Sequence, residues 1–403
     1  MNDDHITTMA KEQALTAILR QAFRPMFLFG ALFSVIAMAL WGLALAGKIQ
    51  LNVYHNVMFW HQHEMIYGFV AAIIVGFLLT AVQNWTGTRA THGTPLLILS
   101  VVWLAGRLLM LFGGDLPQML VAIVDVAFLP LAAFMFGRIV VNAGQQKNLF
   151  FVPILLLLAV SNAIMHAGVL LDQFHFISYG SMNAVWLVTL VMAVVSGRVL
   201  PMFTANGTGT PKVTAKPWLD KLALGSLWLI FILHFFMLIS YIPAKAMAVL
   251  FALAALANAL RLLRVKGWIA WRVPLLWSLH IAIAFIPLGL LLFALRYAGF
   301  AVGASTAVHA LTAGAMGIMI LAMMARVSLG HSGRLLQPKA VMSVAFLLVI
   351  CAALMRVVMA SWFPSLTITW YNGSIIAWVI AYALYILVYT PILTKPRADG
   401  RPG

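Results

Sequence analysis

The sequence predicts an all-α integral membrane protein that crosses the bilayer twelve times. Three observations indicate this fold class: 64% of the 403 residues are hydrophobic, only 8% are charged, and the mean hydropathy is +1.02. A soluble globular domain is usually about 45–50% apolar and about 25% charged. A chain this apolar belongs in lipid, where helices satisfy their own backbone hydrogen bonds.

Twelve apolar runs approach or exceed the length of about 20 residues that a membrane-spanning helix needs. They cover residues 25–46, 60–82, 95–112, 117–140, 150–171, 178–203, 219–239, 243–263, 273–295, 304–328, 339–361 and 370–393. The loops between them are short, and the longest, about 204–218, divides the chain into two halves of six spans. No repeat relates the halves, so we expect an N-terminal segment 1–24, one membrane domain 25–393 and a tail 394–403.

The distribution of basic residues predicts the orientation. If the N-terminus is cytoplasmic, 20 of the 25 Lys and Arg residues lie on the cytoplasmic side. This is the bias that the positive-inside rule describes, and it explains the formal charge of +16 without nucleic-acid binding. Both termini are therefore predicted to be cytoplasmic.

Histidines gather at one predicted depth. His61, His63 and Glu64 lie at the mouth of the second span, where ionisable groups are costly and indicate function. In the predicted orientation, five histidines from four spans share the outer layer: His61, His63, His166, His234 and His309. His280 falls in the inner half of the ninth span, and His331 follows the tenth span on the cytoplasmic side.

Convergence of histidines from several helices indicates haem or metal ligation, because imidazole binds both. A single membrane histidine more often only bonds to a neighbouring helix. The lone Cys351 makes thiolate sites improbable, so all seven of these histidines are candidate ligands for a transition metal. Since helical residues two apart point to nearly opposite sides, His61 and His63 are not expected to share one metal ion.

Polar residues at a similar predicted depth suggest supporting roles. Arg107 and Arg356 could bind haem propionates, although Arg107 could instead pair with Asp125 in the fourth span. Glu64 could hold a ligand in place, act as a ligand or carry a proton, and a plain interfacial carboxylate is an equal alternative. Asn162 precedes His166 by one helical turn, so we expect it to orient that ring.

Several motifs resemble those of the NnrS family. They are FRPMF (23–27), WHQHEMIYGFVAAIIVGFLLTAVQNWTG (60–87), GRVLPMFTAN (197–206), LWSLHIAIAFIPLGL (276–290) and HALTAGAMGIMILAMMARVSLGHSGR (309–334). The resemblance covers nearly the whole chain, and it implies haem b, copper, a bacterial inner membrane and a role in nitric oxide metabolism or nitrosative stress tolerance. The positions that match are His61, His63, Glu64, Arg198, His280, His309 and His331.

The catalytic subunit of haem–copper oxidases and nitric oxide reductases is a more distant analogy. It too has twelve spans, with haem ligands on spans two and ten near the outer face. Pairing His61 or His63 with His309 would reproduce this pattern. The seventh span lacks an adjacent His-His pair, however, so a dinuclear centre is in doubt. Copper ligands stay open among His61, His63, His166, His234 and His280.

The leading functional hypothesis is a haem protein that binds nitric oxide or reduces it with electrons from quinol or another donor. The main alternative is a transporter of a metal, haem or small anion without redox turnover. A sensor or assembly factor is a third class, and no soluble sensing domain supports it. The sequence leaves open whether nitric oxide is substrate or ligand, and what the oligomeric state is.

Overall fold

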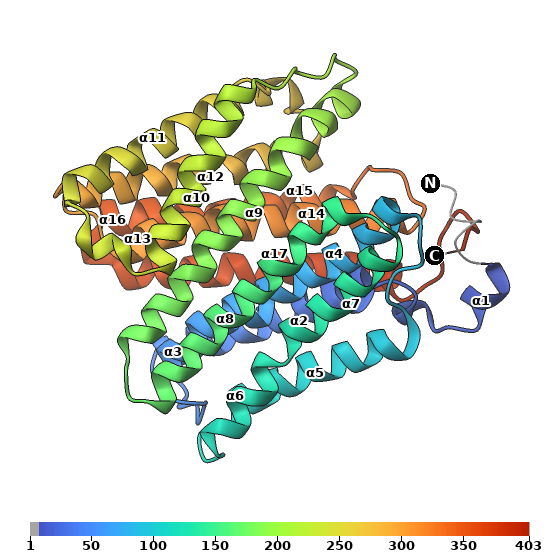
Figure 1. Cartoon of the computed structure of the whole chain (residues 1–403), viewed down its shortest axis with the longest axis horizontal. Coiled ribbons are helices and arrows are strands. Elements are labelled where there is room, and N and C mark those ends of the chain that lie inside the picture. Colours follow the sequence, from blue (N-terminus) through green and yellow to red (C-terminus); the bar gives the residue numbers. More distant parts are fainter. Residues whose placement is uncertain (1–7, 403) are drawn as a thin grey trace. The chain divides into compact units, whose positions relative to one another are not determined.

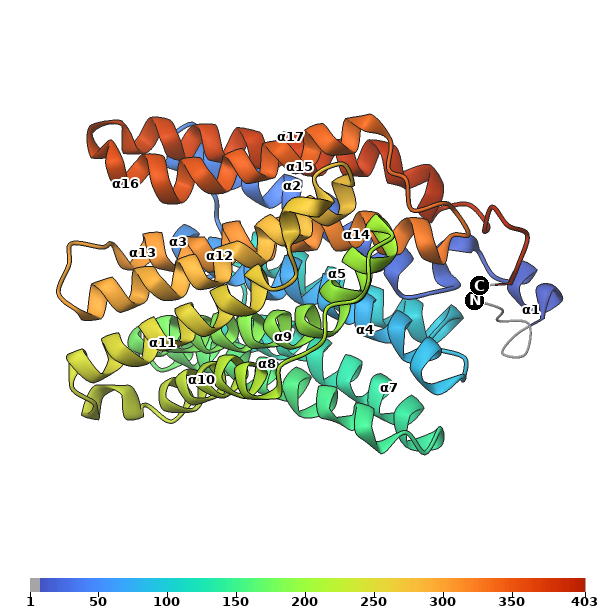
Figure 2. The ribbon, with the colours of Figure 1, turned by 90° about the horizontal axis from the view of Figure 1, so that it is seen from above.

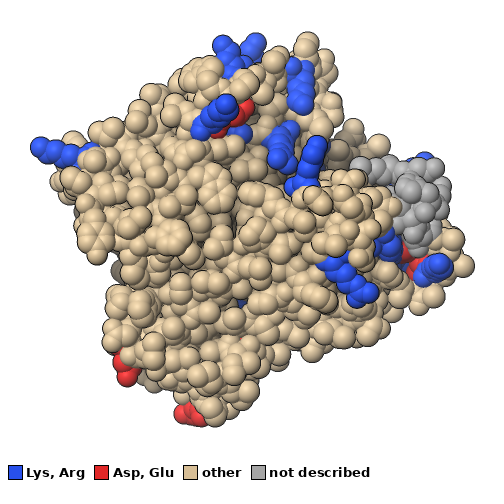
Figure 3. All heavy atoms as spheres, viewed as in Figure 1, with Lys and Arg blue, Asp and Glu red and all other residues tan. Residues whose placement is uncertain are grey.

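The computed structural model describes residues 8–402 and is built from helices (Figure 1). Twelve helical stretches of this part are long and apolar enough to cross a membrane, which confirms the predicted number. They are Phe23–Leu45, Val57–Thr86, Gly93–Phe112, Gln118–Asn142, Gln146–Leu170, His175–Thr208, Pro217–Phe235, Ala244–Leu263, Pro274–Tyr297, Ala304–His331, Ala340–Trp362 and Pro364–Leu393. The face visible in Figure 3 is mostly uncharged, as a lipid-facing surface requires.

Several spans consist of more than one helix. The α-helices are α1 (Met9–Gln13), α2 (Phe23–Leu45), α3 (Val57–His63), α4 (Ala71–Thr86), α5 (Gly93–Phe112), α6 (Gln118–Val126), α7 (Phe128–Asn142), α8 (Phe151–Leu170), α9 (His175–Thr208), α10 (Pro217–Phe235), α11 (Ala244–Leu263), α12 (Pro274–Tyr297), α13 (Ala304–His309), α14 (Gly317–His331), α15 (Ala340–Leu354), α16 (Ala360–Trp362) and α17 (Thr367–Leu393). Short 3-10 turns occupy Ala17–Leu19, Gln146–Phe150, Leu238–Tyr241, Gly267–Ala270 and Pro364–Leu366.

The chain forms two compact units. The first comprises residues 8–184, 324–337 and 382–402, and the second comprises residues 185–323 and 338–381. The boundary therefore falls inside α9, α14 and α17 rather than in the loop after α9. In the first unit, α2 packs on α4, α7 on α8 and α5 on α6. In the second unit, α11 packs against both α10 and α12 (Figure 2).

Three spans contain a π-helical segment, in which the backbone hydrogen bonds run to the fifth residue. These segments are Glu64–Val70 after α3, Ala310–Met316 after α13 and Met355–Met359 after α15. The first directly follows His63, the second directly follows His309, and the third contains Arg356. Wider turns of this kind are rare and occur frequently at functional sites. The three segments thus coincide with residues that the sequence singles out.

The motif at residues 23–27 has a structural role in the first unit. Arg24 is buried and donates hydrogen bonds to the carbonyl oxygens of Leu393 (3.0 Å) and Lys395 (2.7 Å). The last carbonyls of a helix have no partner within it, so this guanidinium caps the end of α17. The tail after α17 also bonds to the end of α14, where Ala398 N–H donates to the carbonyl of Ser332 at 2.9 Å.

Candidate metal centre

A cluster of polar side chains is buried inside the first unit. Its members come from four spans and are at most 4% exposed: His63 at the end of α3, Glu64 beside it, Arg107 on α5, Asp125 on α6, and Asn162 and His166 on α8. Each of these residues is predicted from the sequence as a ligand or a supporting residue of the site. The structure shows that they meet at one place, so we call them the buried cluster.

The two histidines converge on one carboxylate oxygen. The Nε2 atoms of His63 and His166 each lie 3.0 Å from Oδ2 of Asp125. Asn162 donates from Nδ2 to the same oxygen at 2.7 Å, and its Oδ1 lies 2.7 Å from Nε2 of His63. Ligand atoms from His63, Asp125 and His166 all lie within 4.8 Å of one another. Two imidazole nitrogens and a carboxylate at this spacing could hold one metal ion.

In each histidine the other ring nitrogen, Nδ1, also has a hydrogen-bond partner. Nδ1 of His63 lies 2.9 Å from Oε1 of Glu64, and Nδ1 of His166 lies 3.3 Å from the hydroxyl of Tyr54. Burial, followed by the nearby Asp125 carboxylate, raises the pKa of Tyr54 to about 12. The hydroxyl therefore keeps its proton at neutral pH, and its oxygen can accept the Nδ1–H of the His166 tautomer whose Nε2 is free to bind a metal ion. These bonds fix both rings with Nε2 directed toward Asp125.

The charges of the buried cluster nearly balance. Arg107 forms ion pairs with both Glu64 and Asp125, so one guanidinium faces two carboxylates. Both nitrogens of His63 face acceptor oxygens, which is the geometry of an imidazolium with two N–H donors. Charges buried this deeply require compensation. The cluster therefore has room for one positive charge besides Arg107, carried by a proton on His63 or by a metal ion.

The cluster fits a metal ion better than it fits a macrocycle. An axial haem ligand needs a ring nitrogen that faces open space, whereas all four imidazole nitrogens here face hydrogen-bond partners. The His63 ring also packs against Phe59 and His166, with centroids 5.6 and 5.2 Å away. A small ion can replace a hydrogen between these atoms, but a porphyrin cannot enter among them.

The other histidines of the first unit lie outside the cluster. His61 stacks on Trp41 of α2, with ring centroids 4.4 Å apart. It thus turns away from the site of His63, in agreement with their expected opposite directions. His331 ends α14 and packs against Phe23, with centroids 5.7 Å apart. The group of close ligand atoms consists of His63, Asp125 and His166.

The remaining predicted residues belong to the second unit. His280 is buried and bonds through Nε2 to Oγ1 of Thr204 at 2.9 Å. His309 is half-buried, with Nδ1 2.7 Å from the carbonyl of Ser305, and Arg356 donates to Oγ of the same serine at 2.6 Å. His234 is half-buried near the end of α10, and Arg198 is exposed on α9. The predicted axial pair of His309 with His61 or His63 stays a prediction.

The structure gives the contacts of Arg107 and Asn162, for which the sequence suggests partners. Arg107 makes the ion pair with Asp125 that the sequence offers as the alternative to a propionate contact. Asn162 bonds to His63 and Asp125, whereas the sequence suggests His166 as its partner. Sequence reasoning misses Tyr54, which lies in the loop before α3 and follows no spacing rule.

The comparison with known families agrees with these motifs. The model of the family described as NnrS protein matches residues 17–397. No curated protein matches the chain. The matched region contains all twelve spans and every residue of the buried cluster. The chain belongs to the NnrS family.

Proposed function

We propose that this protein binds copper at His63, Asp125 and His166 and acts in nitric oxide metabolism or nitrosative stress tolerance in the bacterial inner membrane. The observation that carries the proposal is the convergence of two histidine Nε2 atoms on one carboxylate oxygen at 3.0 Å each. The choice of copper, the role of nitric oxide and the assignment to the bacterial inner membrane come from the family resemblance. Predicted orientation places the cluster toward the periplasmic side.

The surroundings of the three ligands support metal binding. Metal-bound histidines usually donate their other ring nitrogen to a carboxylate or another fixed oxygen, and Glu64 stands in this place behind His63. Imidazole is a favourable ligand for copper. Monovalent copper would replace the proton on His63 without changing the net charge of the buried cluster. A purely structural role would need only the ion pairs of Arg107, and it gives no reason for two histidines to share Asp125.

Some residues of the cluster would bind the metal ion, and others compensate charge or orient the ligands. Copper, when bound, would supply one-electron chemistry and a coordination position for nitric oxide. Arg107 compensates the charges of Glu64 and Asp125, and Tyr54 keeps the His166 ring directed at the site. The cluster is closed to water, which favours a neutral diatomic ligand that can enter through the lipid. We propose that the protein is an oxidoreductase that reduces nitric oxide with electrons from quinol.

Haem b remains part of the proposal through the family resemblance, with residues outside the buried cluster. His61, His309 and Arg356 are its candidate partners, because the nitrogens of His63 and His166 face other residues. Reduced-minus-oxidised spectra of two variants separate the roles. His309→Ala should remove the low-spin haem bands and retain copper, whereas His63→Ala should do the reverse. Loss of the haem bands in both variants would instead support the His63–His309 axial pair.

The direct test is the copper content of the purified protein after reconstitution. Wild type should hold about one copper ion per chain, because a preformed set of ligands binds its metal stoichiometrically. His166→Ala should lose it. His175→Ala is the matched control, since His175 is exposed at the start of α9 and should change nothing.

The optical or electron paramagnetic resonance spectrum of the copper-loaded protein should change when nitric oxide is added. Equal copper content in wild type and His166→Ala would refute the site. If the protein instead carried metal, haem or an anion into proteoliposomes without a redox change, the transporter alternative would replace the proposal.

A further inference from the structure

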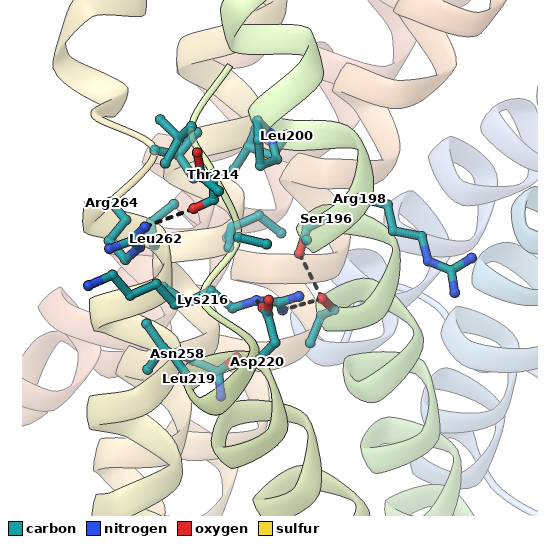
Figure 4. A pocket seen from close by; sticks show the side chains of 18 of the residues that line it. Ser196, Arg198, Leu200, Thr214, Lys216, Leu219, Asp220, Asn258, Leu262 and Arg264 are labelled. Carbon is teal, nitrogen blue, oxygen red and sulfur yellow. Dashed lines mark hydrogen bonds and ion pairs between the residues drawn. The ribbon is translucent and has the colours of Figure 1, made fainter. Parts of the chain in front are cut away.

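A second polar site lies in the second unit, and none of its lining residues belongs to the buried cluster. It is a pocket of about 510 Å³. Its walls come from α9 (193–201), the segment 212–216, the first turn of α10, the end of α11 and two isoleucines of α12 (Figure 4). Leu200, Ile283 and Ile286 are buried apolar residues of its lining, and the more exposed charged residues of the lining form what we call its rim.

Basic side chains dominate this rim. Arg198, Lys212, Lys216, Arg261 and Arg264 line the pocket, and Asp220 is the one acidic residue among them. Figure 4 shows that Arg198 reaches away from Lys216 and Arg264. Asp220 accepts a hydrogen bond from Nε of Arg261 at 2.6 Å and compensates that charge. Lys212, Lys216 and Arg264 remain as positive charges without an acidic partner among residues 8–402.

The pocket is held open by ordered contacts. Arg261 also donates to the carbonyl of Ala193 at 2.6 Å, and Gly197 leaves room for its guanidinium, because any Cβ there would collide with it. Arg264 donates to the carbonyl of Thr214 at 2.8 Å, which ties the segment 212–216 to α11. These bonds fix the loop and the helix end around the cavity. The positive-inside rule accounts for basic loops, but it does not account for a cavity built between them.

The start of α10 adds to the positive potential. Lys216 is the residue before the first turn, where no side chain caps the helix, Pro217 has no N–H, and the N–H groups of Leu219 and Asp220 bond to the carbonyl of Lys216. The N-terminus of a helix carries a partial positive charge and favours anions. Leu219 and Asp220 of this first turn line the pocket. An anion in the pocket would therefore meet three side-chain cations near the positive end of this helix dipole.

The apolar surroundings indicate the source of that anion. Trp218 at the start of α10 is 60% exposed, and Trp is typical of the membrane–water interface. Large apolar side chains are also exposed on both helices, namely Leu222 and Leu229 on α10 and Leu256, Leu260 and Leu263 on α11. This arrangement offers a phosphate site next to a lipid-facing apolar surface. Basic pockets between membrane helices are known to bind anionic headgroups.

We infer that this pocket binds the phosphate headgroup of an anionic phospholipid whose acyl chains extend into the bilayer beside the protein. The inference does not depend on the metal centre, and neither proposal stands or falls with the other. The lipid would join α9, α10 and α11 at the membrane surface. It would also compensate the charges of Lys212, Lys216 and Arg264.

Binding of two lipids with identical acyl chains tests this inference. Native mass spectrometry of the full-length protein should show tighter binding of dimyristoyl phosphatidylglycerol than of dimyristoyl phosphatidylcholine. Each basic residue near an anionic lipid contributes on the order of fivefold in affinity, so Lys212→Gln/Lys216→Gln/Arg264→Gln should lower phosphatidylglycerol binding by at least about tenfold. Arg138→Gln/Lys147→Gln/Lys339→Gln removes three exposed basic residues outside the pocket and should keep the binding.

Three outcomes would overturn the inference. The pocket variant could bind phosphatidylglycerol as tightly as wild type, or the control variant could lose as much affinity as the pocket variant. Millimolar inorganic phosphate could also displace the lipid, which would identify a site for a free anion instead. If the triple variant fails to fold, Lys212→Gln alone is the substitute, because Lys212 lies on an exposed loop and its replacement should not disturb folding. This single variant should lower the affinity for phosphatidylglycerol about fivefold.

Discussion

The buried cluster and the basic pocket both bring charged side chains from several helices together, but the charges have oppositely charged partners in the cluster and mostly lack them in the described part of the pocket. In the cluster, Arg107 is 4% exposed and faces two carboxylates. In the pocket, the amino groups of Lys212 and Lys216 are exposed and have no acidic partner in the described part of the chain. The difference follows from burial, because a charge removed from water must be compensated, whereas water and ions screen an exposed one.

This comparison separates what each group of charges does for the protein. Inside the first unit, the removal of one charge leaves the others uncompensated in a medium of low dielectric constant, so stability should suffer. At the rim of the pocket, the same removal lowers repulsion among cations, so only the binding of an anion should suffer. Variants at these two places therefore have different expected readouts.

The largest effect is expected for Arg107→Gln. Without the guanidinium, Glu64 and Asp125 face each other with no compensating cation from α5. Breaking a buried ion pair in this way costs about 3–5 kcal/mol of unfolding free energy. Denaturant unfolding in mild detergent measures it, with the exposed Arg138→Gln as the control. A loss below about 1 kcal/mol would place this pair in the class of weak surface salt bridges.

Arg24→Gln should have an intermediate effect. Arg24 is buried, yet its partners are carbonyl oxygens at the end of α17 and in the tail after it rather than carboxylates. The variant leaves the carbonyls of Leu393 and Lys395 unpaired, at a cost of about 1–3 kcal/mol. Limited proteolysis of the tail after α17 should be faster than in wild type. Unchanged proteolysis and unfolding would show that water satisfies these carbonyls.

Glu64→Gln sharpens the comparison inside the cluster, because it changes charge and keeps shape. The amide can still contact Nδ1 of His63, but it no longer draws the N–H toward itself as a carboxylate does. Loss of such a supporting partner typically lowers metal affinity about 10–100-fold. Competition with a copper chelator measures the change. An affinity equal to wild type would make Glu64 a partner of Arg107 alone.

Hydropathy and charge predicted the twelve spans well, since a helix in lipid must satisfy its own backbone and needs a fixed length. The observed ends differ by a few residues where polar side chains extend a helix beyond its apolar run, as in His175–Thr208. The π-helical segments were not predicted. They depend on backbone hydrogen bonds that run to the fifth residue instead of the fourth, and hydropathy contains no information on this.

The sequence predicts the residues of the candidate site but few of their contacts, apart from the Arg107–Asp125 pair that it offers as an alternative. Five of its six members stand out because charge and imidazole are rare in apolar spans, and Asn162 stands out because it precedes His166 by one helical turn. Depth alone does not give the rotation of a helix, so it could not show that Asn162 faces His63, or that Tyr54 reaches His166 from a loop. The partners of His280 and His309 are neighbouring hydroxyl and carbonyl oxygens, which depth alone also could not reveal.

The smallest effect on stability is expected for Lys216→Gln, and this contrast with Arg107 is the most direct test of the comparison. Its side chain is exposed and has no acidic partner within residues 8–402, so the unfolding free energy should change by no more than about 0.5 kcal/mol. The affinity for phosphatidylglycerol should nevertheless fall. Both quantities come from one preparation, by denaturant unfolding and native mass spectrometry. A loss of stability as large as that of Arg107→Gln would mean that the rim of the pocket is paired in a way that the exposed position of Lys216 does not indicate.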